Sequence, residues 1–410
     1  MHYIKYTLLL FSFILLCSTG TSGQNYITIT GVVVDAESGD PLIFASIGIR
    51  NKSIGTITNA IGEFDFHIPV ENRNSVIEIN MLGYESYTVS VNEIILTGIN
   101  RFELTKSSKF LQEVVISDSL SGGDIFNIAV SRIENNYPMT PFLMDGFYRD
   151  IKSVAGTHIA LLEAAVKIYD KEYDEPRQKT RLRERVALIE VRKSLGYDNK
   201  FTSFFDQTNL LEDLLLHNIV RYRQFPEDPN FLNQLKREET SFYNGRKIFL
   251  VTLKESDRIK LYIDAMTFAF IRIEYQMGPQ EGIIDRKNGL ESKLHSLQKI
   301  IEFKEYSGKM YLSHIDLLSE IHWIHPRTKE LKFTTELQQQ LLINNIWPNT
   351  SSKIGTTEKM KRFGLQYQYR NYNKGFWDNY NVIKETPLNK KIVEDLEKDL
   401  SLEKQFTDTK

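Results

Sequence analysis

The sequence of 410 residues is poor in cysteine, carries no excess charge of either sign, and has one long apolar run. Its single cysteine, Cys17, directly follows that run, close to the N-terminus. The rest of the chain therefore offers no disulfide, no cysteine metal ligand and no thiol nucleophile, and its stability must come from packed apolar cores. With 51 basic and 53 acidic residues, the formal net charge is −2, which gives no overall field that would favour nucleic acid or an anionic membrane.

The apolar run belongs to a segment, residues 1–23, that has the features of a secretory signal peptide. His2 and Lys5 precede the apolar residues 8–16, and small residues follow. Because this run is too short to persist as a membrane anchor, we expect cleavage just before Gln24 and no transmembrane segment in the mature protein. The predicted location is the periplasm or the periphery of the outer membrane.

Lipidation of Cys17 is the alternative to simple cleavage. A lipoprotein signal requires a small residue immediately before the cysteine, and this chain has Leu16 there. The sequence therefore favours a mature protein without an acyl group.

Motifs of enzymes are missing as well. The chain contains no His-x-x-Glu, His-Glu-x-x-His or Gly-x-Ser-x-Gly string. His322 and His325 have the closest spacing of two imidazoles, but residues three apart on a strand face opposite sides, so they should not share a metal ion. The segment 153–158 resembles a polar loop before a strand, and the pairs Glu238-Glu239 and Glu394-Asp395 resemble solvated charged faces. We therefore predict no enzyme activity, no catalytic residue, no metal site and no cofactor.

The region from Ile27 to Val91 has the pattern of an antiparallel β-sandwich. Short runs of Val, Ile, Thr, Tyr and Phe alternate with polar residues, and turn residues interrupt them about every eight to twelve positions. Two of these interruptions are residues 39–41 and 59–62, where Gly permits positive φ, Pro fixes φ, and Asn can fold back onto its own turn.

The turn and core residues of this region follow an ordered pattern. It consists of Gly31, Val33, Asp35, Ser38, Gly39, Pro41 and Leu42, then Ala45-Ser46-Ile47, Gly55-Thr56, Thr58-Asn59, Gly62 and Phe64, and finally Leu82-Gly83-Tyr84. The pattern resembles the carboxypeptidase-regulatory-like domain of secreted Bacteroidetes proteins. The resemblance implies a seven-stranded prealbumin-like sandwich, and it implies no peptidase activity, because the module is a non-catalytic part of metallocarboxypeptidases.

A short segment after the sandwich, Leu111–Ile116, resembles the connector that follows this module in TonB-dependent receptors. The chain that remains is too short for the barrel of such a receptor, since about 22 strands of about ten residues need roughly 220 residues before any loop. It also lacks the repeated alternation that barrel strands need. We therefore expect a linker at 106–123 and no receptor barrel.

Residues 124–385 are predicted to form a larger α+β domain, a curled antiparallel sheet with helices. Apolar spacing predicts a helix over 124–137 and another over 209–220, where Asn209 and Glu212 have the spacing of a capping box. Alternating runs predict strands with charged outer faces in 145–192 and further strands in three later segments, 301–303, 310–313 and 331–333.

Residues 242–276 carry a second resemblance. Two strands flank the polar residues 255–257, and Leu261-Tyr262-Ile263-Asp264 leads into a tight turn at 265–267. The pattern resembles the curled sheet of outer-membrane lipoprotein carriers and related periplasmic lipid-binding proteins. That resemblance implies an apolar ligand, or a lipidated partner, on the concave side of the sheet. Leu261 and Ile263 alternate with Tyr262 and Asp264, so one set should face a core or cavity and the other the opposite side.

The C-terminal part, residues 386–410, is predicted to be a helix and a tail. Pro387 should begin the helix, with Ile392, Val393, Leu396 and Leu400 on one face, and residues 405–410 should fray. An aromatic cluster precedes it: Tyr367, Tyr369, Tyr372, Phe376, Trp377 and Tyr380. The tyrosines either pave a strand while Phe376 and Trp377 hold the helix, or the cluster forms a surface for sugar or a partner.

Taken together, the sequence predicts a mainly β protein with some helix, divided into a signal peptide (1–23), a sandwich (24–105), a linker (106–123), a sheet domain (124–385) and a C-terminal helix and tail (386–410). We interpret it as a non-enzymatic envelope protein that binds or scaffolds at the outer membrane. The partner is a lipid or lipidated protein, or an outer-membrane protein; one alternative is an interaction module of a polysaccharide-uptake or adhesion complex, and another is a hydrolase.

Overall fold

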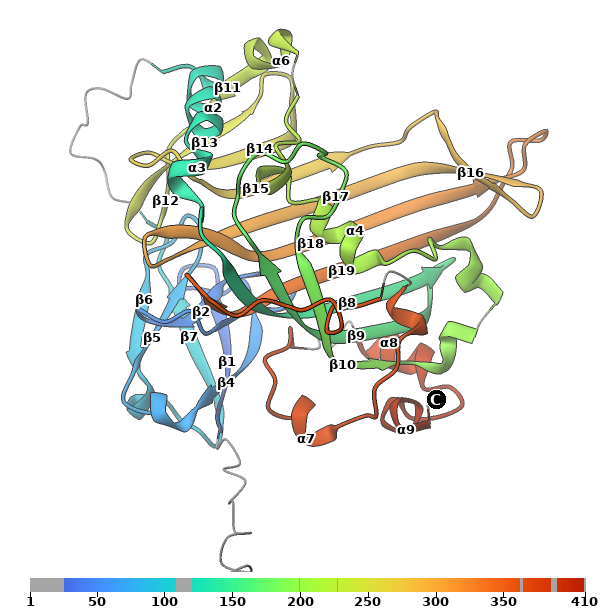
Figure 1. Ribbon diagram of the computed structural model, residues 1–410, viewed down its shortest axis with the longest axis horizontal. Coiled ribbons are helices and arrows are strands. Elements are labelled where there is room, and N and C mark those ends of the chain that lie inside the picture. Colours follow the sequence, from blue (N-terminus) through green and yellow to red (C-terminus); the bar gives the residue numbers. More distant parts are fainter. Residues whose placement is uncertain are drawn as a thin grey trace, which may run out of the picture.

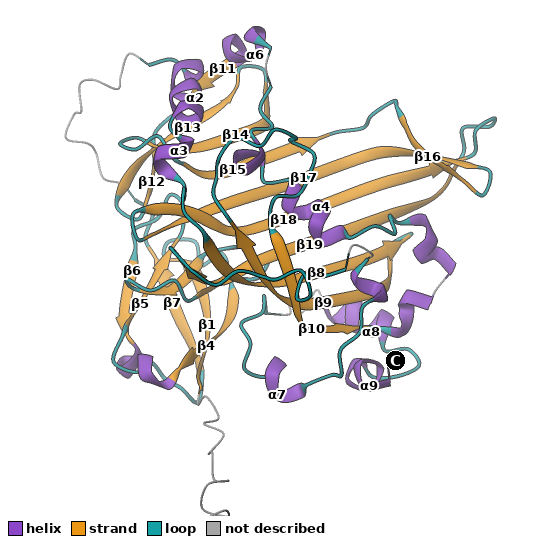
Figure 2. Cartoon of the chain, in the orientation of Figure 1, coloured by secondary structure: helices purple, strands orange, loops and turns teal. Residues whose placement is uncertain are grey.

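The computed structural model describes residues 26–107, 120–198, 200–226, 228–361, 364–384 and 389–408. The predicted signal peptide, the connector Leu111–Ile116 and Pro387 lie outside these ranges. A small two-sheet unit and a large twisted sheet make up most of the described chain, with short helices beside the large sheet (Figures 1 and 2). The predicted mainly β fold class with some helix is confirmed.

The N-terminal unit is a sandwich of two sheets. One sheet has the strand order β4-β1-β7 and the other β3-β2-β5-β6. The strands are β1 (Tyr26–Asp35), β2 (Ser46–Ile49), β3 (Gly55–Ile57), β4 (Glu63–Pro69), β5 (Val76–Asn80), β6 (Tyr87–Ser90) and β7 (Ile99–Leu104). Their alternate apolar residues, among them Ile29, Phe66 and Ile79, are fully buried between the sheets.

Residues of the sequence pattern hold the turns of this sandwich. The Asp35 carboxylate accepts hydrogen bonds from the backbone N–H of Ser38 (2.9 Å) and Glu37 (2.8 Å), and from the Tyr84 hydroxyl (2.8 Å). The backbone N–H of Ser38 and the Tyr84 hydroxyl hold the pKa of Asp35 well below its usual range. Gly62 has a φ of 76°, and a Cβ there would lie 2.5 Å from the Val33 carbonyl oxygen, so only glycine fits.

The large sheet has twelve strands and is antiparallel throughout. Its main path runs β10-β9-β8-β19-β18-β17-β15-β14-β13-β11, with β12 on β13 and β16 on β17. The strands are β8 (Phe142–Val154), β9 (Thr157–Asp170), β10 (Arg185–Lys193), β11 (Leu235–Arg237), β12 (Ser241–Tyr243), β13 (Arg246–Leu253), β14 (Ser256–Asp264), β15 (Phe270–Met277), β16 (Ile283–Lys287), β17 (Leu290–Tyr306), β18 (Lys309–Ile324) and β19 (Leu331–Trp347). The predicted strands in 145–192, 242–276 and the three later segments are confirmed.

Short helices lie beside this sheet. They are α2 (Gly122–Ser131), α3 (Ile133–Asn136), α4 (Leu210–Leu216), α5 (Ile219–Tyr222), α6 (Pro229–Gln234), α7 (Lys374–Trp377), α8 (Asn389–Leu396) and α9 (Leu402–Asp408). The single helix predicted over 124–137 forms as two: α2 begins earlier, at a capping box formed by Ser121 and Asp124, and ends before Arg132, after which α3 begins. The prediction of a single helix over 209–220 is wrong, because α4 ends before His217 and Asn218 caps a second helix, α5.

One face of the large sheet, here called the inner face, is apolar and packs against α2, α3 and α4. Leu188 on β10 and Leu235 on β11 lie near opposite ends of the strand order, yet both belong to one buried cluster with Leu214 of α4. The sheet therefore curls around this face. Leu261 and Ile263, 2% and 0% exposed, belong to the same cluster, so among the described residues the curl is filled by the protein's own side chains.

The opposite, outer face carries charged residues, and other segments cover the part of it formed by β8, β9 and β10. On β8 and β9, Arg149 is 3% and Glu163 0% exposed. The rings of Trp377 and Phe406 lie 4.4 and 5.1 Å from the Arg192 guanidinium. The prediction that the strands in 145–192 expose charged outer faces is therefore wrong in part, because the C-terminal segment packs onto these charges (Figure 1).

The C-terminal segment differs from its prediction in three ways. No strand forms in residues 364–384, and Tyr367 and Tyr369 are exposed, whereas Trp377 is buried against Phe147. The helix in the predicted segment, α8, ends at Leu396, so Leu400 lies beyond it. Gln405, expected to fray, is buried in α9 and bonds to the Leu396 and Leu400 carbonyls.

Asp395 and Glu394, predicted as a solvated pair, also behave differently from one another. Glu394 is exposed, but the Asp395 carboxylate accepts a 3.0 Å hydrogen bond from the backbone N–H of His158 and lies 3.1 Å from its ring nitrogen Nδ1. Asp395 thereby fixes α8 to the start of β9. The exposed-pair prediction fails because an acidic residue on an amphipathic helix can lie at the edge of its buried face.

Residues 381–384 join the sandwich to the large sheet. The Asn381 side chain exchanges hydrogen bonds with the backbone of His67 on β4, and the backbone carbonyl of Asn381 accepts one from the Asn344 side chain on β19 (2.7 Å). Lys384 lies 3.2 Å from Asp65. The two units and the C-terminal segment therefore form one contact network. No described helix is both long and apolar enough to span a membrane.

Candidate functional site

A cleft of about 800 Å³ lies between the sandwich and the large sheet. The β2–β3 hairpin forms one wall, and the ends of β13, β17 and β19 form the other. Its polar lining residues include Ser46, Ser53, Thr56, Glu78, Asn80, Tyr243, Arg246, Lys304 and Glu305. A volume of this size falls in the range of pockets that hold small molecules.

Lys304 crosses the base of this cleft. It lies near the end of β17, and its Nζ donates hydrogen bonds to the carbonyl oxygens of Ser53 (2.9 Å) and Ile343 (3.3 Å). Burial lowers the pKa of Lys304 to about 8. The side chain therefore ties the hairpin to the sheet and places a cation beside the cleft at neutral pH.

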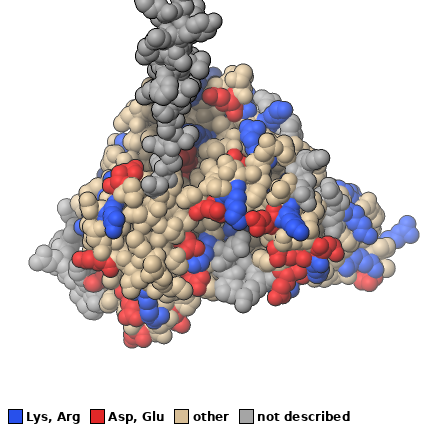
Figure 3. All heavy atoms as spheres, turned by 90° about the horizontal axis from the view of Figure 1, so that it is seen from below, with Lys and Arg blue, Asp and Glu red and all other residues tan. Residues whose placement is uncertain are grey.

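Ion pairs fix the other charged groups of the lining. Arg246 lies 2.6 Å from the Glu305 carboxylate and 3.4 Å from that of Asp264, and Asp264 in turn accepts the backbone N–H groups of Met266 and Thr267. Arg50 lies 3.5 Å from Glu78. Both signs of charge are therefore present, and neither dominates. Figure 3 shows the same intermixing on the face seen from below.

Two lining residues have buried polar atoms that could bond to a ligand. The Thr56 hydroxyl and the Asn80 side-chain oxygen are buried and have no hydrogen-bond partner among the described residues. A buried polar group without a partner costs about 1–3 kcal/mol. A ligand that donates to Asn80 and bonds to Thr56 would recover that cost.

A second, smaller pocket of about 550 Å³ lies between α2, α3 and the chain leading into α6. Its floor is apolar, with Phe126, Val130 and Phe225, and Lys179 and Glu134 are among the charged residues at its edge. This pocket lies beside α2 and α3, and Phe126 and Ile133 of the buried cluster form part of its lining. It could hold an apolar group of limited size.

The sequence-level candidates do not gather in either pocket. Ser153, Val154 and His158 belong to strands β8 and β9, joined by a turn at residues 155–156, rather than to a polar loop. His325 lies in the turn after β18. The cleft residues come from 46–56, 78–80, 243–246, 304–307, 313 and 342–343, and no motif links these segments. Lys304 stands beside Glu305 on a strand that carries several other charged residues, so no signal in the sequence marked it.

One group of three described residues has metal-ligand types close together: His295, Glu320 and His322. The sequence does carry part of this pattern, because Glu320 and His322 are two apart on one strand and so share a face. The contribution of His295 depends on the pairing of β17 with β18, which the sequence alone does not provide.

The solved structures that resemble the chain do so at low scores. A lipovitellin structure described by its lipid–protein interactions has 11% identity and a TM-score of 0.26, and covers 57% of this chain, which spans 28% of that one. A DUF1329 family protein from Desulfovibrio piger has 10% identity and a TM-score of 0.21, over 57% of this chain and 95% of its own. A LolA superfamily protein from Nitrosomonas europaea has 11% identity and a TM-score of 0.19, over 59% of this chain and 99% of its own.

Comparison of the sequence with protein families identifies the N-terminal part of the chain. None of the curated protein sequences matches the chain significantly. The family model of the CarboxypepD_reg-like domain matches residues 29–116, the part that begins with β1 and includes the turn residues described above. The resemblance predicted from the sequence is thus confirmed, and the N-terminal sandwich of this chain is a CarboxypepD_reg-like domain.

Proposed function

We propose that the protein is a non-enzymatic component of the cell envelope that binds a polar ligand, a short oligosaccharide, in the cleft between its two units. The observation that carries the proposal is the lining of this cleft, which combines hydroxyl, amide and charged groups with buried, unpartnered oxygens on Thr56 and Asn80. Sugars present many hydroxyl groups that both donate and accept, so they match such a lining better than an apolar molecule does.

The arrangement of charges supports binding rather than catalysis. A general base must be available to accept a proton from the substrate, whereas the carboxylates of Glu305 and Glu78 pair with Arg246 and Arg50. The regulatory-like class of the N-terminal domain also favours a non-catalytic role. The signal-like residues 1–23 support secretion, and thus a place in the periplasm or at the outer membrane.

Direct binding measurements test the proposal. Mature protein is screened against an array of oligosaccharides, and the best ligand is measured by calorimetry with Asn80→Leu and Lys304→Met. We expect each substitution to weaken binding about tenfold or more, because each removes a hydrogen-bonding group from the cleft. Gln298→Leu, on an exposed part of β17 away from the cleft lining, is the control and should bind as the parent does.

Thermal melts of each variant separate lost binding from lost folding. Failure of every oligosaccharide to bind, or full affinity in folded Asn80→Leu and Lys304→Met, would refute the cleft as the ligand site.

The smaller pocket supports a second candidate, an apolar ligand such as a fatty acid. Its floor of Phe126, Val130 and Phe225 is apolar, and Lys179 at its edge could pair with a carboxylate head group. A fluorescent fatty acid should then bind the parent and lose affinity in Phe225→Asp, while Asn80→Leu has no effect. The reverse outcome for the two variants would exclude this pocket.

A further inference from the structure

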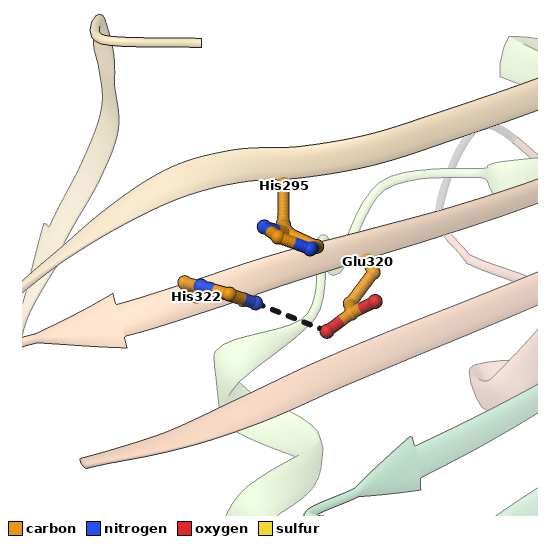
Figure 4. A group of neighbouring side chains, drawn as sticks. All are labelled: His295, Glu320 and His322. Atoms are coloured by element: carbon orange, nitrogen blue, oxygen red, sulfur yellow. Dashed lines mark hydrogen bonds and ion pairs between the residues drawn. The ribbon is translucent and has the colours of Figure 1, made fainter. Parts of the chain in front are cut away.

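His295, Glu320 and His322 bring two imidazoles and a carboxylate together on β17 and β18 of the large sheet (Figure 4). Ligand atoms of the three side chains lie within 4.8 Å of one another. The two imidazole rings stack with centroids 3.9 Å apart, and His322 Nε2 lies 3.0 Å from a Glu320 carboxylate oxygen. All three residues are half-buried, so solvent reaches them.

Strand geometry explains why the three residues meet. Glu320 and His322 alternate with Ile321 on β18 and therefore point to the same, outer face. On β17, Leu294 pairs with Ile321 and Ser296 with Glu320, which leaves His295 as an extra residue in a β-bulge. Such a bulge redirects a side chain, and here it brings the His295 ring over His322.

Neighbouring charges make this place favourable for a cation. Glu336 on β19 pairs directly with Glu320, and like charges on directly opposite residues destabilise a sheet. Lys293, which pairs with His322, has its amino group 2.9 Å from Glu281 and is thus held by another carboxylate. A divalent ion between the strands would offset the repulsion between the two glutamates.

We propose that His295, Glu320 and His322 form a binding site for a divalent first-row transition-metal ion such as Zn²⁺. Metal–nitrogen and metal–oxygen bonds are about 2.0–2.2 Å long, so the three ligand atoms must approach one another more closely than they do now. Because a metal ion lies in the plane of each imidazole it binds, one stacked ring must turn about its Cβ–Cγ bond. Both rings are partly exposed, and this rotation is open to them.

The ligand set selects the class of ion. Imidazole nitrogens suit Zn²⁺, Cu²⁺ and Ni²⁺, whereas Ca²⁺ and Mg²⁺ prefer sites made of oxygen ligands alone. Three protein ligands leave a coordination position for water or for a group from a partner molecule. The site lies outside the cleft lining, so it is independent of the oligosaccharide proposal.

Titration with zinc chloride tests the site. The mature chain is used without a polyhistidine tag, at pH 7.5, and binding is followed by calorimetry. We expect one Zn²⁺ per chain, no binding of Mg²⁺, and affinity at least about tenfold lower in His295→Ala, His322→Ala and Glu320→Gln. His325→Ala is the matched control, because His325 lies just beyond β18 and outside the group.

Melting curves with and without zinc give a second readout, since an ion that binds only the folded state raises Tm. The parent and His325→Ala should gain Tm with zinc, and the double variant His295→Ala/His322→Ala should not. Absence of zinc binding by the parent, or unchanged affinity in the double variant, would overturn the proposal.

Discussion

The two faces of the large sheet are built by the same strands, yet they are covered to different extents and in different ways. The inner face is apolar and meets helices that are themselves apolar, such as α4 with its buried Leu211 and Leu214. The outer face carries a row of mostly polar residues in register across neighbouring strands: Lys260, Glu274, Ile300, Asp316, Gln340, Arg149, Glu163 and Arg192.

Pairing of charges is what allows the outer face to be covered. Glu163 accepts hydrogen bonds of 2.6 Å from both Arg149 and Arg192, and Arg272 bonds to both Glu274 and Glu302. Although burial alone would raise it, Arg192 and Arg149 hold the pKa of Glu163 below its ordinary value. A sheet face that carries charged residues can therefore pack against other segments of the protein when these charges neutralise one another.

The largest effect is expected from a charge placed on the inner face. Leu261→Asp puts a carboxylate into a site that is 2% exposed and surrounded by apolar side chains. Because the new carboxylate would lie among apolar side chains, we expect a loss of at least about 5 kcal/mol and little folded protein. Circular dichroism and urea unfolding measure this loss.

Arg258→Asp is the control on the same strand, where the side chain is exposed. It should change stability by no more than about 0.5 kcal/mol. A folded Leu261→Asp protein would mean that the curl is a wet cavity, and the contrast between the faces would fail.

A somewhat smaller loss is expected when a pairing on the outer face is broken. Glu163→Gln keeps the shape of the side chain but leaves Arg149 and Arg192 without their shared counter-ion. Removing one partner of a buried pair costs about 3–5 kcal/mol, so urea unfolding should show a loss in that range.

Glu103→Gln provides the matched comparison, because Glu103 pairs with Arg101 and both side chains are exposed to solvent. Such exposed pairs contribute about 0–1 kcal/mol. Equal effects of the two substitutions would show that the outer face is solvated, contrary to the structure.

Much of the fold could be predicted because it follows from local patterns. Turn residues such as Asp35 and Gly62 stand at recognisable spacings along the chain, so the sandwich could be identified from them, even though Asp35 also bonds to Tyr84 and Gly62 lies against Val33. Alternation along 145–192 and 242–276 predicts strands for the same reason.

What covers a face is decided by residues distant in sequence, and those could not be predicted. Alternation places Glu163 and Arg192 on the outer face, but the covering of Arg192 depends on Trp377 and Phe406, which are distant in the sequence. The cleft and the group around His295 likewise depend on strand register, which a single sequence does not specify.

A combined substitution tests whether the buried charges of the outer face are themselves needed for stability. Replacing Arg149, Glu163 and Arg192 together, as Arg149→Met/Glu163→Leu/Arg192→Met, removes all three charges and keeps side-chain volume. Apolar replacement of a buried ionic group is often neutral or stabilising, so we expect stability within about 2 kcal/mol of the parent, well above that of Glu163→Gln. A triple variant as unstable as the single one would show that the charges themselves are needed for docking.

The smallest effect has the opposite sign and depends on pH. Asp316 lies in the outer row, is half-buried, and accepts a 2.8 Å hydrogen bond from Gln340. Burial raises its pKa to about 6, partly offset by Gln340 and Arg272. We therefore expect Asp316→Asn to be more stable than the parent by about 1–2 kcal/mol at pH 7.5, since the neutral amide avoids burial of a charge.

The sign follows from proton binding. Because the pKa of Asp316 is higher in the folded than in the unfolded state, its protonated form favours folding below about pH 4, and this contribution is lost as pH rises through about 6. The advantage of the asparagine variant should therefore shrink towards pH 4. Burial lowers the pKa of the neighbouring His314 to about 3, but that group titrates in both proteins and cancels in their difference. Exposed Asp257→Asn serves as the control, and a variant no more stable than the parent at pH 7.5 would show that Asp316 is solvated and that the outer row is open there.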